Sequence, residues 1–362
     1  MKAPAWDVAA VRTYNFLSSE YRTLFARSGG TAFQSPLWLD RLYGRVASDL
    51  KAEPLIVTIR EADGNRLVAI LPLIVRRRGL LRIAEFADFG VSDYCAPICD
   101  AAWVTALRND TTIPRRVHAI LQSCDLLLIK KVRAEALPLF DILGSTRRAP
   151  LPFTAHATNL LAPFAAWREA SISPSQRRFL DAKRKWLVKR GSVTTSAATS
   201  LQDFLEVLEN IRGFREHRFR STGNVDILTK ETFARFYRDI AVEAPPARAY
   251  LMRLNGSIIA AGFGLVHDQT FHLILSGFDF LNFRNASLGL LLIEDMIADC
   301  IARGERSVDM TIGDQAYKRE FGTHETAMWS IWTGLSMRGR LAGLAWSRSG
   351  RLRQLTRRLP RR

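Results

Sequence analysis

The sequence predicts a mixed α+β protein of two units, each a mixed, mainly antiparallel sheet flanked by helices. Three observations support this prediction. A chain of 362 residues is long for one hydrophobic core. Residues 55–75 and 250–266 share a plan of strand, tight polar turn and apolar strand. In the second half, a stretch with helical periodicity is followed by a short apolar strand.

Composition and charge are those of a globular protein that favours anionic ligands. Hydrophobic residues make up 48% of the chain and charged residues 24%. The net charge is +17, and the segment from Arg338 onward supplies +9 of it through nine arginines with no acidic residue. The remaining +8 is modest for a nucleic-acid-binding protein.

Neither a metal site nor a membrane span is indicated. The cysteines, Cys95, Cys99, Cys124 and Cys300, have no His or second Cys pair at zinc-site spacing, so free thiols are expected. The amino terminus lacks the apolar core of a signal peptide, and no run approaches the roughly 20 apolar residues of a membrane helix. A cytoplasmic protein is expected, with peripheral association at the inner membrane left open.

The first half is expected to contain helices over residues 8–50 and a hairpin over Pro54–Arg78 with its turn at residues 63–65. A polar loop, FADFGVSDYCAP, follows at residues 86–97. Next come a helix near residues 113–123 and a buried strand at residues 126–129. Prolines at 138, 150 and 152 predict a boundary, so the units are expected at 1–152 and 153–336, with a basic tail at 337–362.

The second half is expected to follow a definite order of elements. These are a strand at 155–161, a basic helix at 174–190, a strand at 192–198, helices at 200–218 and 229–243, a hairpin at 250–266, a strand at 270–276, a helix at 290–301, strands at 307–311 and 328–334, and a short helix carrying residues 316–318.

The stretch from Asn285 to Gly322 is the centre of the functional interpretation. A small-residue entry precedes the helix of residues 290–301, and it consists of Asn285, Ala286, Ser287, Leu288 and Gly289. Free N–H groups and the helix dipole at such an entry favour a phosphate.

The order of elements in the second half resembles the GNAT acyltransferase fold. The resemblance implies that residues 285–289 hold the pyrophosphate of an acyl-CoA donor, and that the next strand splays away to admit the pantetheine arm. The loop here keeps one glycine, Gly289, and a neighbouring Arg284, where the family's loop is richer in both types.

The segment Ala316-Tyr317-Lys318, followed by Phe321-Gly322, is similar to the Ala…Tyr-Glu-Lys-x-Gly-Phe run of GNAT enzymes. The resemblance implies that Tyr317 protonates the departing thiolate and that Lys318 lies at the substrate. A phenol near the sulfur can donate a proton as negative charge develops. The alternative is that Tyr317 packs on the preceding helix and that Lys318 is solvated.

Two further segments, FADFGVSDYCAP and VDMTIGDQAYKREFG, together resemble the branch that includes the CelD proteins of cellulose biosynthesis and, more distantly, the FemAB aminoacyl transferases. Both groups carry two GNAT-like units. On this reading Asp93 and Asp309 are candidate catalytic bases, and Ser92 and Tyr94 candidate substrate ligands. Asp93 as a loop cap and Asp309 as a strand-end contact are the structural alternatives.

Several charged groups remain open to two interpretations. The helix of residues 174–190 either binds the 3′-phosphate of coenzyme A, an anionic acceptor or RNA, or is a solvated face. The tail either lies on anionic lipid as an amphipathic helix or is disordered. Glu294 and Asp295 are expected on the polar face of their helix, and His272 is expected in the core more readily than at a site.

The sequence therefore predicts an acyltransferase that moves an acyl group from acyl-CoA to an amine or hydroxyl, in envelope or polysaccharide metabolism on the strength of the resemblance alone. One alternative is a FemAB-like transferase that uses aminoacyl-tRNA. Another is a non-catalytic GNAT-like scaffold that binds a membrane synthase through its basic tail.

Overall fold

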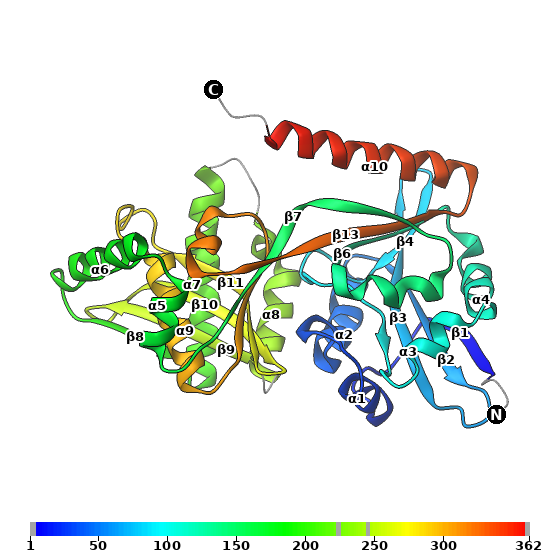
Figure 1. Ribbon diagram of the computed structural model, residues 1–362, viewed down its shortest axis with the longest axis horizontal. Helices are drawn as coiled ribbons and strands as arrows, with labels where there is room; N and C mark the ends of the chain where they lie inside the picture. Colours follow the sequence, from blue (N-terminus) through cyan, green and yellow to red (C-terminus); the bar gives the residue numbers. More distant parts are fainter. Residues whose placement is uncertain (1–4, 222–225, 244–246, 359–362) are drawn as a thin grey trace. The chain divides into compact units, whose positions relative to one another are not determined.

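The computed structural model describes residues 5–221, 226–243 and 247–358 (Figure 1). They fall into two compact units. Unit 1 comprises Met1–Thr154 and Thr326–Arg362, and unit 2 comprises Ala155–Glu325. Among the described residues, every helix is too short or too polar to cross a lipid bilayer.

Unit 1 is built on a mixed sheet with the strand order β1-β2-β3-β4-β6-β13. The bounds are Trp6–Val11, Glu53–Glu61, Leu67–Arg78, Leu81–Phe86, Leu126–Arg133 and His324–Gly334, and β5 (Ile98–Cys99) pairs with β3. Only β4 and β6 pair in parallel; the other named pairs are antiparallel. The predicted hairpin of residues 54–78 is confirmed as β2 and β3.

The helices of unit 1 surround this sheet. They are α1 (Ser19–Ala26), η1 (Ala32–Gln34), α2 (Pro36–Arg41), η2 (Leu42–Ala47), α3 (Val104–Asn109), α4 (Thr112–Ile120), η3 (Leu121–Ser123), η4 (Ala134–Leu143) and α10 (Met337–Arg358). The expectation of helices from residue 8 is wrong at its start, because residues 6–11 form β1. This strand pairs with β2 about 50 residues later and buries Trp6.

Unit 2 repeats the plan with the strand order β8-β9-β10-β11-β12-β7. The bounds are Val193–Ala197, Ala247–Leu254, Ser257–His267, Thr270–Phe278, Ser307–Ile312 and Arg147–Asn159. Again one pair, β11 with β12, is parallel and the rest are antiparallel. The prediction of a mixed, mainly antiparallel sheet in each unit is confirmed.

The helices of unit 2 cover both faces of its sheet. They are α5 (Phe164–Ser171), α6 (Pro174–Val188), α7 (Leu201–Ser221), η5 (Ile227–Thr229), α8 (Glu231–Glu243), α9 (Leu288–Ala302) and η6 (Ala316–Phe321). Neighbouring strand residues point to opposite faces. A Cβ on Gly262 would lie 3.0 Å from the sulfur of Met296 in α9, whereas Phe263 contacts Tyr237 of α8. Helices α9 and α8 therefore lie on opposite faces.

The sixth strand of each sheet follows the fifth strand of the other unit in the chain. After β6 of unit 1 the chain enters β7, whose end pairs with β12 of unit 2. After β12 the chain enters β13, whose residues from Met328 onward pair with β6. The units thus exchange their sixth strands.

This exchange changes the expected domain limits. Residues 326–336 were expected in the second unit and the tail by itself, but the structure places both in unit 1. The physical reason is packing: Ile331 is fully buried in the core of unit 1, and Leu344 and Trp346 of α10 pack against a cluster that contains Ile83 and Trp332.

Glu294 is buried and does not lie on an exposed face of α9, contrary to expectation. Its side chain is 3% exposed and accepts hydrogen bonds from Arg168 of α5 at 2.7 Å and Arg184 of α6 at 2.9 Å. Arg184 also binds Asp295 at 2.6 Å. Arg184 of α6 therefore takes part in an ion-pair network that links α5, α6 and α9.

The substitution Glu294→Ala is expected to lower the free energy of unfolding by about 3 kcal/mol, because it leaves two arginines without their buried carboxylate. Urea denaturation measures this change. Glu169→Ala, at an exposed position of α5, is the control, with an expected change below about 0.5 kcal/mol. Equal stability of the two variants would contradict a structural role for Glu294.

Candidate functional site

The central feature of unit 2 is the separation of its two parallel strands. Strands β11 and β12 pair over three residues only, ending with His272 opposite Asp309. Beyond this point β11 continues to Phe278 beside β10. Strand β12 is irregular between Asp309 and Ile312, where Thr311 takes a φ of +56°. The sheet therefore opens at the carboxyl end of β12.

A His–Asp pair lies at the vertex of this opening. His272 Nδ1 is 3.3 Å from Asp309 Oδ2, and both residues are 4% exposed. Asp309 Oδ1 accepts a hydrogen bond of 2.7 Å from the N–H of Thr311. Such a pair can accept and hold a proton. Sequence reasoning singled out Asp309 and placed His272 in the core, because an isolated histidine in a strand gives no sign of its partner.

Lys318 of η6 binds the same end of β12. Its ammonium donates hydrogen bonds to the carbonyls of Met310, Thr311 and Ile312 at 2.8, 3.2 and 2.9 Å, and the residue is 3% exposed. The alternative that Lys318 is solvated is therefore wrong. A buried cation here fixes the strand end and adds positive charge beside the opening.

Tyr317 precedes Lys318 and is half-buried. Its ring packs against the apolar cluster that α9 forms with the sheet. The packing expected for Tyr317 is thus present. The structure brings Tyr317, Lys318 and Asp309 to one end of β12.

His156 is a further polar residue of this region, and no motif or spacing in the sequence pointed to it. It comes from β7, is fully buried, and lies 3.2 Å from Thr323 Oγ1 and 4.0 Å from Asp314. Burial and then the Lys318 ammonium lower its pKa. His156 is therefore neutral at pH 7 beside the charged lysine.

The amino-terminal entry of α9 follows β11. Ser287 takes a φ of +55° as the residue before the helix, while Ala286 and Leu288 are buried. A Cβ on Gly289 would lie 3.1 Å from the Phe278 ring. The N–H of Ala286 donates to the Phe283 carbonyl at 3.0 Å, and Leu288 and Gly289 form the start of α9, where the first N–H groups of a helix have no partner within it.

The remaining candidates, Ser92, Asp93 and Tyr94, lie in unit 1. Ser92 is fully buried and accepts a hydrogen bond of 2.8 Å from the Trp38 indole. Tyr94 is 2% exposed and packs edge-on against Phe33 at 5.4 Å. Both side chains are therefore held in contacts within the core of unit 1.

Asp93 is half-buried near Lys131 of β6. Burial acts to lower the pKa of Lys131, but the charges of Asp88 and Asp93 outweigh it and raise that pKa. Lys131 Nζ also donates to the Ser92 carbonyl at 2.8 Å. Asp93 thus belongs to a charged cluster of unit 1, whereas Tyr317, Asp309 and Lys318 belong to unit 2.

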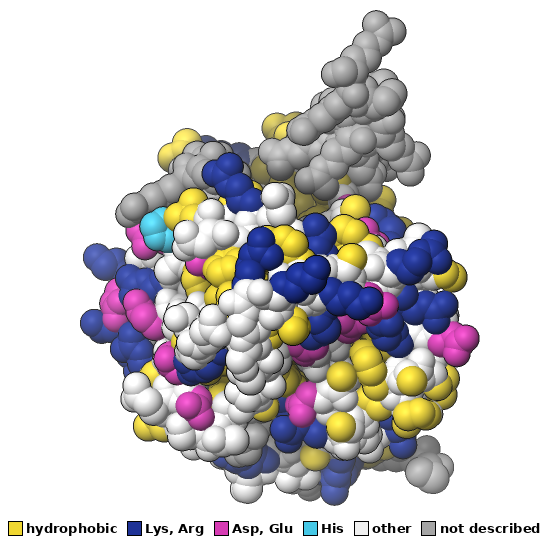
Figure 2. Space-filling view, turned by 90° about the vertical axis from the view of Figure 1, so that its left-hand side faces the viewer, with side chains coloured by type: hydrophobic (Ala, Val, Ile, Leu, Met, Phe, Trp, Pro, Cys, Tyr) yellow, Lys and Arg dark blue, Asp and Glu magenta, His cyan; other side chains and the backbone are white. Residues whose placement is uncertain are grey.

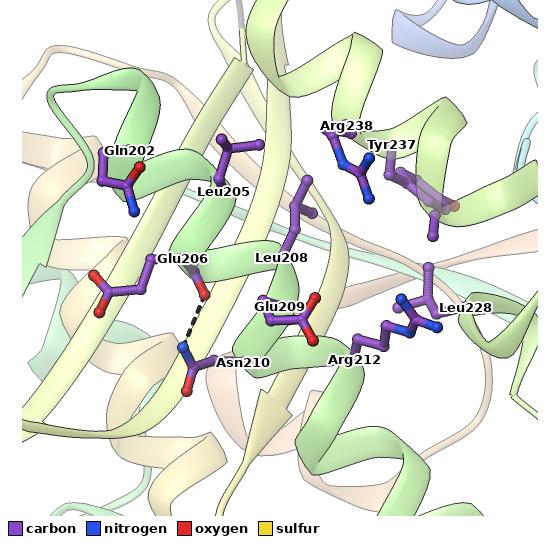
Figure 3. Close-up of a pocket in the computed structure, with 11 residues that line it drawn as sticks. Gln202, Leu205, Glu206, Leu208, Glu209, Asn210, Arg212, Leu228, Tyr237 and Arg238 are labelled. Carbon is purple, nitrogen blue, oxygen red and sulfur yellow. Dashed lines mark hydrogen bonds between the residues drawn. The ribbon is translucent and has the colours of Figure 1, made fainter. Parts of the chain in front are cut away.

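A groove of about 540 Å³ lies between α7 and α8 of unit 2 (Figure 3). Leu205, Leu208 and Leu228 supply apolar surface, Arg212 and Glu209 line the groove from α7, and Arg238 lines it from α8. Both arginines lie 4.0 Å from the same carboxylate, Glu231. The groove could hold an apolar ligand with a negatively charged end.

In the described part of the chain, no three His, Cys, Asp or Glu side chains come together as a metal ion would require.

Residues 174–319 match the family model described as an acetyltransferase (GNAT) domain. The GNAT fold is thereby shown for unit 2. The match runs from α6 into η6 and includes α9, His272, Asp309 and Lys318. It supports a place for the chain in the GNAT acetyltransferase superfamily. A search among curated proteins finds no match.

Solved structures share the GNAT-type architecture over nearly the whole chain. The structure of FemX has a TM-score of 0.60 at 11% identity, covering 93% of this chain and 99% of that one. The C-terminal domain of a putative lysylphosphatidylglycerol synthetase from Agrobacterium fabrum has a TM-score of 0.56 at 10% identity, covering 90% and 93%. L-PGS from Bacillus licheniformis has a TM-score of 0.56 at 11% identity, covering 92% and 97%. At these identities the likeness shows the fold alone.

Proposed function

We propose that unit 2 is an acyltransferase that moves an acyl group from acyl-CoA to an amine or hydroxyl. The observation that carries the proposal is the separation of β11 and β12 beside the start of α9. Such an opening can admit the narrow pantetheine arm of the donor, and the N–H groups of Leu288 and Gly289 at the start of α9 can bind its pyrophosphate. The match of residues 174–319 to the GNAT acetyltransferase domain supports this assignment.

The chemical step needs a proton acceptor and a proton donor. In our proposal Asp309, with His272 at 3.3 Å, receives the proton of the attacking amine or hydroxyl. The nucleophile adds to the thioester carbonyl, and the tetrahedral intermediate collapses with cleavage of the carbon–sulfur bond. Tyr317 donates its phenolic proton to the departing thiolate. The positive charge of Lys318 at the end of β12 favours the oxyanion of the intermediate.

Calorimetry on the full chain with acetyl-CoA and longer acyl-CoAs tests donor binding. We expect a dissociation constant in the micromolar range and a kcat that falls at least tenfold in Tyr317→Phe with donor affinity unchanged. Tyr250→Phe is the matched control, because this tyrosine hydrogen-bonds Asp299 in the same unit and has no role in the proposed chemistry. No binding of any acyl-CoA at millimolar concentration would overturn the coenzyme A assignment.

A second candidate is a FemAB-like transferase that uses aminoacyl-tRNA. The likeness to FemX over 99% of that chain and the single glycine in residues 285–289 favour it. Retention of tRNA that is lost at high salt, together with inert coenzyme A, would select this candidate.

A third candidate is a non-catalytic scaffold of the CelD-like, polysaccharide-associated branch, which binds a membrane synthase through the arginines of α10. It requires that Tyr317→Phe combined with Asp309→Asn leave the cellular phenotype intact, and that deletion from Arg338 onward abolish it.

A further inference from the structure

The loop between β11 and α9 exposes two large hydrophobic side chains at neighbouring positions. Phe280 is 43% exposed and Leu281 is 56% exposed. The Asp279 carboxylate accepts hydrogen bonds from the N–H and the side-chain amide of Asn282, at 3.0 and 2.7 Å, which closes the turn around them. Large apolar side chains exposed together on a folded surface mark a contact site more often than isolated ones do.

Helix α6 adjoins this loop and adds a third exposed hydrophobic side chain. Phe179 is 39% exposed, and the Lys183 ammonium lies 5.1 Å from the centre of its ring. The same ammonium donates a hydrogen bond of 2.6 Å to the carbonyl of Asn285. On the loop itself, the Arg284 guanidinium lies 5.4 Å from the Phe280 ring. The loop and α6 thus form one surface, which we call the α6–loop surface.

The α6–loop surface is strongly basic. Lys183 and Arg284 lie beside its two aromatic rings, and exposed basic side chains continue along α6 and just past its end at Arg178, Lys185, Lys189 and Arg190. The single acidic residue of α6, Asp181, is bound to Arg168 at 2.6 Å, and Asp279 is engaged within its own loop. Figure 2 looks onto the end of the molecule that carries α6, where hydrophobic side chains lie among Lys and Arg side chains. Charge of this sign favours an anionic partner.

We propose that the α6–loop surface binds the interface of an anionic lipid bilayer. Phe179, Phe280 and Leu281 enter the boundary between head groups and acyl chains, and the surrounding lysines and arginines contact lipid phosphates. This surface lies in unit 2 and is separate in sequence from the arginines of α10.

A lipid surface fits these residues better than RNA does. Single-stranded RNA is held by aromatic faces on which bases stack. Leu281, the most exposed of the three apolar side chains, has no such face, and cations already lie over the rings of Phe179 and Phe280. Two adjacent apolar side chains at the tip of a loop, framed by cations, are suited to shallow insertion.

Sedimentation of the full chain with vesicles tests the proposal, using phosphatidylglycerol mixed with phosphatidylcholine, and phosphatidylcholine alone. We expect binding to the anionic vesicles and at least tenfold weaker binding to the neutral ones. The double variant Phe280→Ser, Leu281→Ser is expected to lower the partition coefficient at least tenfold. Arg178→Glu with Lys185→Glu is expected to do the same, and the loss is expected to diminish as salt screens the charge of the wild type.

The matched control is Leu201→Ser with Val242→Ser, which removes two side chains of similar exposure, 54% and 48%, from α7 and α8. This control is expected to bind vesicles as the wild type does, and an unchanged thermal transition shows that each variant is folded. Wild-type binding by the Phe280/Leu281 variant would overturn the proposal. So would loss of all vesicle binding on deletion from Arg338, or retention of tRNA without any binding to vesicles.

Discussion

The Lys318→Met variant is expected to lose about 3 to 5 kcal/mol of stability and all measurable transfer activity. The substitution keeps the length of the side chain and removes the ammonium that three carbonyls at the end of β12 share. Leaving a buried carbonyl without its donor costs about 1 to 3 kcal/mol. The irregular turn around Thr311, with its φ of +56°, is expected to relax with it.

Arg319→Met is the control for this experiment. Arg319 is the next residue of η6 and pairs with Glu325 at 2.6 Å, but both side chains are at least 40% exposed. The loss of an exposed pair costs at most about 1 kcal/mol. Urea denaturation measures both variants, and activity is compared at a temperature where both are folded. Similar stability of the two variants would show that the Lys318 contacts with β12 contribute little.

Ile331→Asp is expected to unfold unit 1, although residue 331 follows unit 2 in the sequence. Ile331 is fully buried in the core of unit 1, where β13 pairs with β6. A carboxylate at this position loses the apolar contacts and buries a charge, which costs several kcal/mol in practice. Ala327→Asp is the control, because that residue lies in the same strand and is exposed.

Hydrogen exchange followed by mass spectrometry distinguishes the two units directly. Ile331→Asp is expected to abolish protection in β3 and β6 and to leave a larger share of it in β10 of unit 2. If β10 lost protection while β3 and β6 kept it, the assignment of β13 to unit 1 would be wrong.

Much of the fold could be predicted because its signals are local. The two hairpins, the helix of residues 288–302 and the strand after it each show their own periodicity and turn residues. Strand β1 could not be found in this way, since six residues with modest alternation become a strand only against β2. The destination of β13 is likewise set by pairing with residues about 200 positions earlier.

In the candidate site, too, the sequence predicts features that depend on neighbouring residues and misses those that depend on contacts between distant segments. Asp309 could be selected from the sequence because a carboxylate within an apolar strand requires either a site or a buried cationic partner. In the structure its partner is His272. The burial of Lys318 depends on backbone carbonyls of β12 near Thr311 that accept its hydrogen bonds. The spacing of residues in the sequence does not predict this contact. His156 reaches the region from a strand some 160 residues earlier than Lys318.

The exchange of sixth strands has a consequence for the order in which the newly made protein folds. While the ribosome is still translating the second half, β6 already stands complete with the edge that β13 will later cover. An exposed strand edge of this kind invites pairing with other chains. The first unit made is therefore the last to be finished, and translation must pass residue 334 before β6 gains its final neighbour.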